Sequence, residues 1–125
     1  MSKKGGSMNI DKMVKSLMAR PNSNKIGMIA SHLGVVRGTS RDGKPVKAIE
    51  VWYEKEILDD IMQKIKSLPG IIDVIVEVKE GKLDVGDPIL GVAVAGDFRE
   101  NVFPALVSAV DQIKEKAAFK KELIR

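Results

Sequence analysis

A chain of 125 residues, 44% of them hydrophobic and 30% charged, fits one globular domain that can bury a core without disulfides. Cysteine is absent and histidine occurs once, which excludes disulfides, thiolate metal sites, a cysteine nucleophile and a histidine-rich metal centre. The net charge of +4 favours a small anionic ligand or an acidic partner protein over nucleic acid, because the basic residues are scattered and base-stacking aromatics are few.

The start of the chain predicts a tail and a helix. Residues 1–7 are polar and glycine-rich, so we expect a flexible tail, followed by one domain over residues 8–125. Asn9 is placed to cap a helix that Pro21 ends. The apolar residues of this helix recur at helical spacing: Ile10, Met13, Val14, Leu17 and Met18.

Two predicted strands follow, separated by a basic loop. Residues 25–36 and 46–53 are rich in β-branched and small apolar residues, which is typical of strands. Residues 37–45 hold two glycines, a proline and three cations, and predict a mobile loop.

The second half predicts a helix, two strands and a final helix, over residues 54–68, 72–78, 89–95 and from Arg99 onward. The strand at 89–95 is apolar throughout, so we expect it at the centre of a sheet, covered on both faces. The last helix is expected to bury Phe103, Leu106, Val107, Val110 and Ile113. The order helix-strand-strand-helix-strand-strand-helix favours an α+β fold over a doubly wound parallel sheet.

Lys114 is the most informative candidate for chemistry. On a helical projection it falls on the same stripe as Phe103, Val107 and Val110, which we expect to face the core. Two interpretations follow: the helix end leaves the core and the lysine reaches water, or the lysine lines a cleft where a neutral amine can act as base or nucleophile. Lys121 shares this face only if the helix continues to it.

Other polar residues have weaker claims. Arg37 stands at a strand end, where a guanidinium can bind phosphate or carboxylate in a bidentate manner, whereas Arg41 and Lys44 are expected merely to keep the loop soluble. Arg99 opens the last helix although the helix dipole disfavours a cation there. His32 is a possible general base, but a structural role is favoured for a lone histidine on a strand.

Several common patterns are missing from the sequence. Gly81, Gly86 and Gly91 do not form a dinucleotide fingerprint, and no P-loop, zincin or hydrolase elbow occurs. No apolar run is long enough to span a bilayer and no signal-peptide pattern opens the chain, so we expect a cytoplasmic protein with no membrane partner.

Five segments, in order, resemble the large (catalytic) subunits of molybdopterin synthase: residues 32–37 (HLGVVR), 48–54 (AIEVWYE), 81–87 (GKLDVGD), 92–103 and 114–122 (KEKAAFKKE). The most specific match is GKLDVGD, which is similar to the family's GRLEVGE hairpin. The resemblance covers nearly the whole chain from Met8 onward and implies the family's α+β fold, of α/β-hammerhead type.

The resemblance implies a sulfurtransferase of molybdenum cofactor biosynthesis. The family inserts two sulfurs into cyclic pyranopterin monophosphate, forming the dithiolene of molybdopterin. Sulfur arrives as a thiocarboxylate on the C-terminal Gly-Gly of a small ubiquitin-like subunit. Two large subunits form a central homodimer with a small subunit at each end, a heterotetramer. The chain's lack of cysteine fits an enzyme in which the small subunit delivers the sulfur and the large subunit supplies the pocket. The resemblance implies no bound cofactor or metal.

The resemblance also implies site residues. Lys114 and Lys121 match the two active-site lysines in an ungapped alignment, and Lys120 takes the second place if one residue is missing near Phe119. Arg37 and Arg99 match arginines of the pterin-phosphate pocket.

The chain departs from the family at several of these places. Ala118 and Lys120 replace a proline and a tryptophan, Phe98 replaces a histidine, and His32 replaces a phenylalanine. Many members also have an extension beyond the position of Arg125. Two alternatives therefore stay open: a non-catalytic relative acting as a dimeric ligand- or protein-binding module, and, less favoured, a nucleic-acid-binding module.

Overall fold

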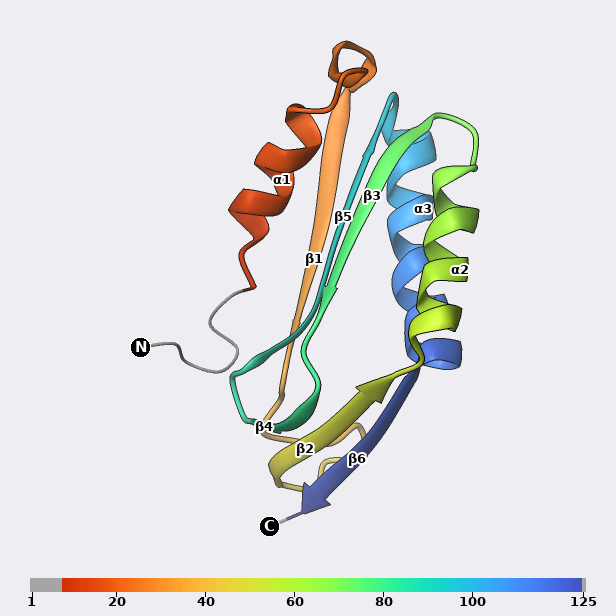
Figure 1. Ribbon diagram of the computed structural model, residues 1–125. Coiled ribbons are helices and arrows are strands. Elements are labelled where there is room, and N and C mark those ends of the chain that lie inside the picture. The colour runs from red at the N-terminus through yellow and green to blue at the C-terminus, as the bar shows by residue number, and fades with distance from the viewer. Residues whose placement is uncertain (1–7, 125) are drawn as a thin grey trace.

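The computed structural model describes residues 8–124, and the predicted tail at 1–7 lies outside the described residues. The predicted α+β class is confirmed (Figure 1). The elements are α1 Ile10–Met18, a 3₁₀ turn Ser23–Lys25, β1 Met28–Val35, β2 Val46–Tyr53, α2 Lys55–Lys66, β3 Ile71–Val78, β4 Gly81–Asp84, β5 Pro88–Gly96, α3 Arg99–Gln112, a π-helical turn Ile113–Ala117 and β6 Ala118–Ile124. Among the described residues, no helix is long and apolar enough to cross a membrane.

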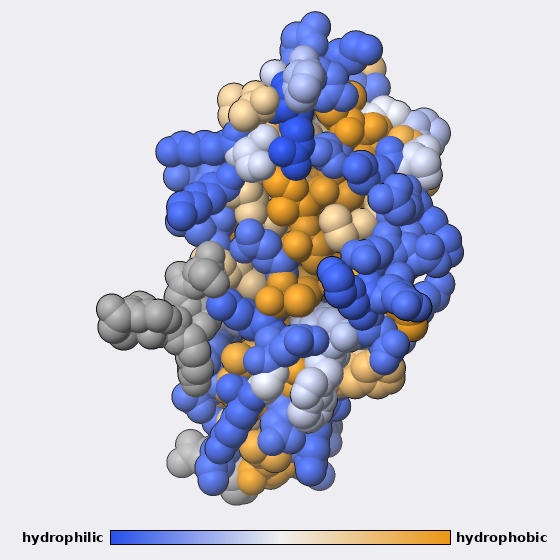
Figure 2. Space-filling view, in the orientation of Figure 1, coloured by the Kyte–Doolittle hydropathy of each residue, from blue (hydrophilic) through white to orange (hydrophobic). Residues whose placement is uncertain are grey.

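The larger sheet is antiparallel, in the order β1-β5-β3, with α1 on one face and α2 and α3 on the other (Figure 1). The predicted central position of β5 is confirmed, since Leu90 to Gly96 are all buried. Two clusters pack against it, one under α1 around Met13 and Leu17 and one under α2 and α3. Figure 2 shows an apolar band over this sheet, between the charged surfaces of α1 and α2.

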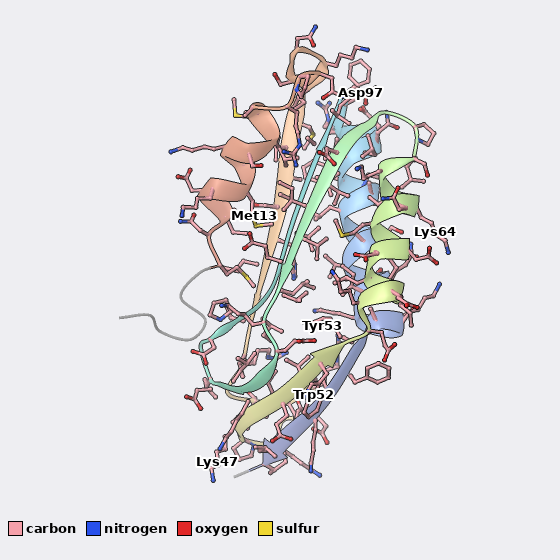
Figure 3. All side chains as sticks on the ribbon, viewed as in Figure 1. Met13, Lys47, Trp52, Tyr53, Lys64 and Asp97 are labelled. Atoms are coloured by element: carbon pink, nitrogen blue, oxygen red, sulfur yellow. The ribbon has the colours of Figure 1, made fainter. Side chains whose placement is uncertain are left out.

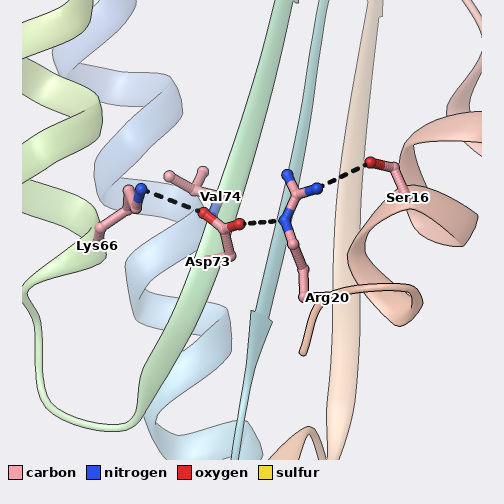
Figure 4. Close-up of polar contacts among 5 residues, drawn as sticks. All are labelled: Ser16, Arg20, Lys66, Asp73 and Val74. Atoms are coloured by element: carbon pink, nitrogen blue, oxygen red, sulfur yellow. Dashed lines mark hydrogen bonds and ion pairs between the residues drawn. The ribbon is translucent and has the colours of Figure 1, made fainter. Parts of the chain in front are cut away.

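A charged group ties three elements together at one end of the sheet (Figure 4). The Asp73 carboxylate accepts a 2.6 Å hydrogen bond from Nε of Arg20 and lies 3.6 Å from Nζ of Lys66. Arg20 Nη1 also donates to the Ser16 hydroxyl at 3.3 Å. Burial alone would raise the pKa of Asp73, but hydrogen bonds from Arg20 and the Val74 amide, together with the nearby Lys66 ammonium, hold it below its ordinary value.

The smaller sheet is antiparallel, in the order β4-β2-β6, and it closes over a third, separate cluster. This cluster consists of Val36, Val46, Ile49, Val51 and Leu83. Strand β2 has the predicted bounds of 46–53. Strand β6 was not expected, because charged residues occupy three of its seven positions and no apolar alternation marks it; pairing with β2 along most of its length satisfies the backbone groups on that side.

The basic loop at 37–45 folds into a defined turn. A bridge joins Thr39 to Pro45, and the Ser40 hydroxyl accepts a 3.0 Å hydrogen bond from the Lys44 amide and donates to Asp42. Gly43 has a φ of 87°, which a residue with a side chain rarely adopts. The turn directs the loop back toward the junction of the two sheets.

Candidate active site

A pocket of about 200 Å³ lies where the two sheets meet. Its floor and walls are the end of β1, the basic loop, the inner face of β2, the start of β5, the π-helical turn and β6. The apolar lining comes mainly from Val36, Ile49, Ile89 and Leu90. The polar lining consists of Arg37, Thr39, Arg41, Tyr53, Lys114, Lys120 and Glu122.

The charge of this pocket is strongly positive. Four cations and one carboxylate give a formal charge of 4 − 1 = +3 within the lining. The carboxylate of Glu122 is 3.8 Å from Nζ of Lys120, so one cation is partly neutralised. The remaining cations suit a phosphate or a carboxylate, which guanidinium and ammonium groups bind through charge-assisted hydrogen bonds. Among residues 8–124 no group of histidine and acidic side chains could hold a metal ion.

Lys114 reaches the pocket from the exposed side of the last helix. The buried side of α3 carries Val102, Ala105 and Ala109, and it continues through Ile113 and Ala117. The prediction that Phe103 and Val107 face the core is therefore wrong: they are 52% and 59% exposed. The small alanines allow α3 to pack closely on the sheet, which turns the larger side chains outward.

The position of Lys120 and Lys121 on strand β6 determines which way their side chains point. Alternation along a strand places Lys120 and Glu122 on the face that lines the pocket, whereas Lys121 points to the opposite face. Lys121 would share the face of Lys114 only if the helix continued to it, and this condition is not met, because the helix ends at Ala117. The structure thus brings Lys114, Lys120 and Arg37 together and leaves Lys121 outside.

Arg99 lies at the other end of α3. It is 114 − 99 = 15 residues from Lys114, which corresponds to about 22 Å along a helix. Arg99 lines a shallow hollow with Met28, Phe98 and Phe103. Within one chain it cannot share a ligand with the pocket.

His32 lies next to the pocket, on β1. Its buried Nε2 has no hydrogen-bond partner among the described residues. Burial, and secondarily the positive charge of Lys114, lowers the pKa of His32 below 6.5, so the imidazole is neutral at neutral pH.

Among the polar pocket residues, sequence reasoning missed Thr39, Arg41, Tyr53 and Glu122. Arg41 was assigned to solvent, but the turn at 40–43 brings it back to the pocket. Tyr53 continues the inward alternation of Ile49 and Val51, a signal that was available in the sequence; Figure 3 shows it at the junction of β2 with the helices. Burial, and secondarily the carboxylate of Glu80, raises the pKa of Tyr53 to about 12, so the phenol stays protonated and can donate a hydrogen bond.

Comparison with known proteins decides the family. The family model described as "MoaE protein" matches residues 6–116. The chain belongs to the MoaE family. The matched stretch includes Arg37, Arg99 and Lys114 and ends before β6.

Individual relatives agree with this assignment. The molybdopterin synthase catalytic subunit of Ralstonia nicotianae is 32% identical over an alignment of 107 residues, and the match covers 82% of this chain and 60% of that protein. The chain therefore spans less than two thirds of that relative's length.

Solved structures share the fold. Molybdopterin cofactor biosynthesis protein E from Burkholderia multivorans superposes with a TM-score of 0.75 at 31% identity, covering 94% of this chain and 82% of that one. A complex of subunits 1 and 2 of molybdopterin-converting factor from Helicobacter pylori gives 0.70 at 15% identity, covering 94% and 80%, a likeness in fold alone. The predicted family and its α+β fold are both confirmed.

Proposed function

We propose that this chain is the catalytic subunit of a molybdopterin synthase, transferring sulfur from the C-terminal thiocarboxylate of a small subunit to cyclic pyranopterin monophosphate. The observation that carries the proposal is the +3 pocket, formed by Arg37, Arg41, Lys114, Lys120 and Glu122 in a chain of this family. Both reactants bring negative charge to one place, a phosphate and a thiocarboxylate, and a chain without cysteine needs its sulfur delivered.

Each cation has a proposed role. Arg37 and Arg41 bind the cyclic phosphate, because two guanidinium groups on one wall offer paired donors to its oxygens. Lys114 is the reacting amine. Lys120 is the second lysine of the site, supported by its place in the pocket lining, and Lys121 is the competing assignment.

The transfer can be written so that its atoms balance. The thiocarboxylate sulfur bonds to an electrophilic carbon of the pterin side chain, while an oxygen substituent breaks away from that carbon and leaves as water or as the opened phosphate, giving a thioester. Water then adds to the acyl carbon and the acyl carbon–sulfur bond breaks, leaving the small subunit as a carboxylate and the pterin as a thiolate. Lys114 either takes the proton from that water or captures the acyl group as an amide, and only capture leaves a covalent adduct of the two chains.

A second copy of the chain would complete the pocket. The exposed Phe103 and Val107 form a stripe on α3 beside β1, an edge strand of the larger sheet. Val107 is eight residues from Arg99 and seven from Lys114 (107 − 99 = 8; 114 − 107 = 7). If two α3 helices cross antiparallel at Val107 about a two-fold axis, the Arg99 of each copy lies near the Lys114 of the other.

The sulfur donor would be a small ubiquitin-like protein. The Helicobacter relative is itself a complex of two subunits of a molybdopterin-converting factor. A Gly-Gly tail is thin enough to enter a pocket of this size, and its terminal negative charge is attracted by the lining. The proposed compartment is the cytoplasm, to be checked by fractionating cells that express the tagged chain.

The test is reconstitution with the purified chain, thiocarboxylated small subunit and cyclic pyranopterin monophosphate. Molybdopterin should form, and Lys114→Ala should slow its formation by about 100-fold or more, the usual effect of removing an acid–base group. Lys64→Ala, on the exposed face of α2, is the control and should have no effect.

Three other outcomes would change the assignment. Unchanged activity of Lys114→Ala would remove this residue from the site. No product from the wild-type chain, while it still binds phosphate in the pocket, would favour the non-catalytic binding module. Tight, salt-dependent binding of single or double strands would favour the nucleic-acid module.

A further inference from the structure

The unpartnered nitrogen of His32 needs an explanation beyond packing. Buried nitrogen acceptors without a hydrogen bond are uncommon, because they lose water and gain nothing in return. Strands β1 and β5, which surround His32, carry no other ionisable side chain. The family resemblance places phenylalanine at this position, and a phenyl ring would fill the space without an unpaired acceptor.

The position of this nitrogen points toward the pocket. His32 and Gly34 share one face of β1, and Gly34 lines the pocket. A Cβ on Gly34 would lie 3.1 Å from His32 Nε2, tighter than ordinary contact, so the imidazole occupies space that a side chain at residue 34 would take. The acceptor nitrogen of His32 therefore lies directly behind Gly34, which forms this part of the pocket wall.

Lys114 is the donor that the chain offers to this acceptor. It lines the same pocket, and its charge acts on the imidazole. Lysine carries three N–H donors on a long flexible stem, and a neutral imidazole has one acceptor nitrogen. Arg37 and Lys120 also line the pocket.

We propose that His32 is a positioning residue for Lys114, accepting an N–H of the Lys114 side chain at Nε2 and holding that amine against the Gly34 wall of the pocket. No hydrogen bond joins the two in the described structure, where Nε2 of His32 has no partner. The bond forms when Lys114 turns inward, as it must to meet an acyl group entering the pocket. The role of the Lys114 amine in sulfur transfer rests on the proposed function, whereas the His32–Lys114 contact does not.

The sole histidine makes the contact directly measurable. Nitrogen-15 NMR of the labelled chain, with and without inorganic phosphate, reports which ring nitrogen carries the proton. The wild-type ring should be neutral with its proton on Nδ1, since Nε2 must be free to accept. Lys114→Met should shift the tautomer toward Nε2–H and raise the pKa of the imidazole. An Nε2–H tautomer in the wild type, or an unchanged spectrum in Lys114→Met, would overturn the proposal.

Activity supplies the second measurement. His32→Phe should lower kcat on the order of tenfold with KM little changed, as expected when a reacting group loses its orientation. His32→Gln, whose amide oxygen can accept the same bond, should recover most of the loss. Equal kcat in the wild type and His32→Phe, or equal losses in both variants, would contradict a positioning role.

Control measurements separate the two proposals. Circular dichroism and thermal melting of both variants show whether either change disturbs folding. If the wild type makes no molybdopterin but its NMR behaves as expected, the proposed function fails and the His32–Lys114 contact stands. If the wild type is active but its NMR shows no contact, the positioning role fails and the function stands.

Discussion

Replacing Arg37 by glutamine should weaken binding of cyclic pyranopterin monophosphate by a predictable amount. Two unit charges about 4 Å apart interact by about 1 kcal/mol in water and about 4 kcal/mol at an effective dielectric constant of 20. The pocket is open to solvent and keeps three other cations, which places the effect nearer the lower figure. A hydrogen bond to a charged group contributes about 1.5–3 kcal/mol, so we expect a loss of about 2 kcal/mol, roughly 30-fold in Kd.

Calorimetric titration at low and at physiological salt measures this loss. Lys64→Gln removes the same charge from the outer face of α2, and screening should keep its effect within about twofold. If Arg37→Gln and Lys64→Gln weaken binding equally, only the overall charge of the molecule matters and the pocket is not the phosphate site.

Three further predictions concern the second lysine, the stability of the fold and the dimer. Lys120→Ala should reduce sulfur transfer about tenfold or more while Lys121→Ala leaves it nearly unchanged, and a reversed order in the reconstituted assay would restore Lys121 to the site. Asp73→Asn should lower the free energy of unfolding by about 1–2 kcal/mol at pH 7, since its cationic partners are partly exposed. The pKa of Asp73 is lowered in the fold, so its contribution is present above 3.8 and is lost as the pH falls through the folded value; a difference from wild type in urea titrations that persists in acid would contradict this. Val107→Asp should convert a dimer to a monomer in sedimentation, because it places like charges at the proposed two-fold axis, and an unchanged dimer would move the interface elsewhere.

Local patterns predicted those parts of the fold that depend on neighbouring residues. Asn9 caps α1 as expected, accepting a 3.1 Å hydrogen bond from the Lys12 amide. Strands β2 and β5 were predicted almost to the residue, because one alternates toward a core and the other is apolar throughout. These signals lie within a few residues of each other in the chain.

The errors arose where distant contacts decide. The last helix has apolar residues on two sides, so the spacing of these residues could not show which side packs on the sheet. The structure places Ala105 and Ala109 there, and Phe103 and Val107 are exposed. Strand β6 is formed by pairing with β2, about seventy residues earlier in the chain, and its sequence shows no apolar alternation that would reveal that partner. Arg37 was predicted as a site residue from its position at a strand end. Lys114 was predicted from a helical stripe expected to face the core, although Phe103 and Val107 of that stripe are exposed.

The one-sided pairing of β6 has a consequence for how the pocket comes apart. This strand bonds only to β2, so its backbone amides should exchange with solvent deuterium faster than those of β5, which is paired on both sides. When β6 peels away, Lys120 and Glu122 leave together and take the local counter-charge with them. The opposite wall of the pocket, formed by β1 and β5, is held in the larger sheet and stays in place. The pocket therefore opens by movement of β6 about Ala117.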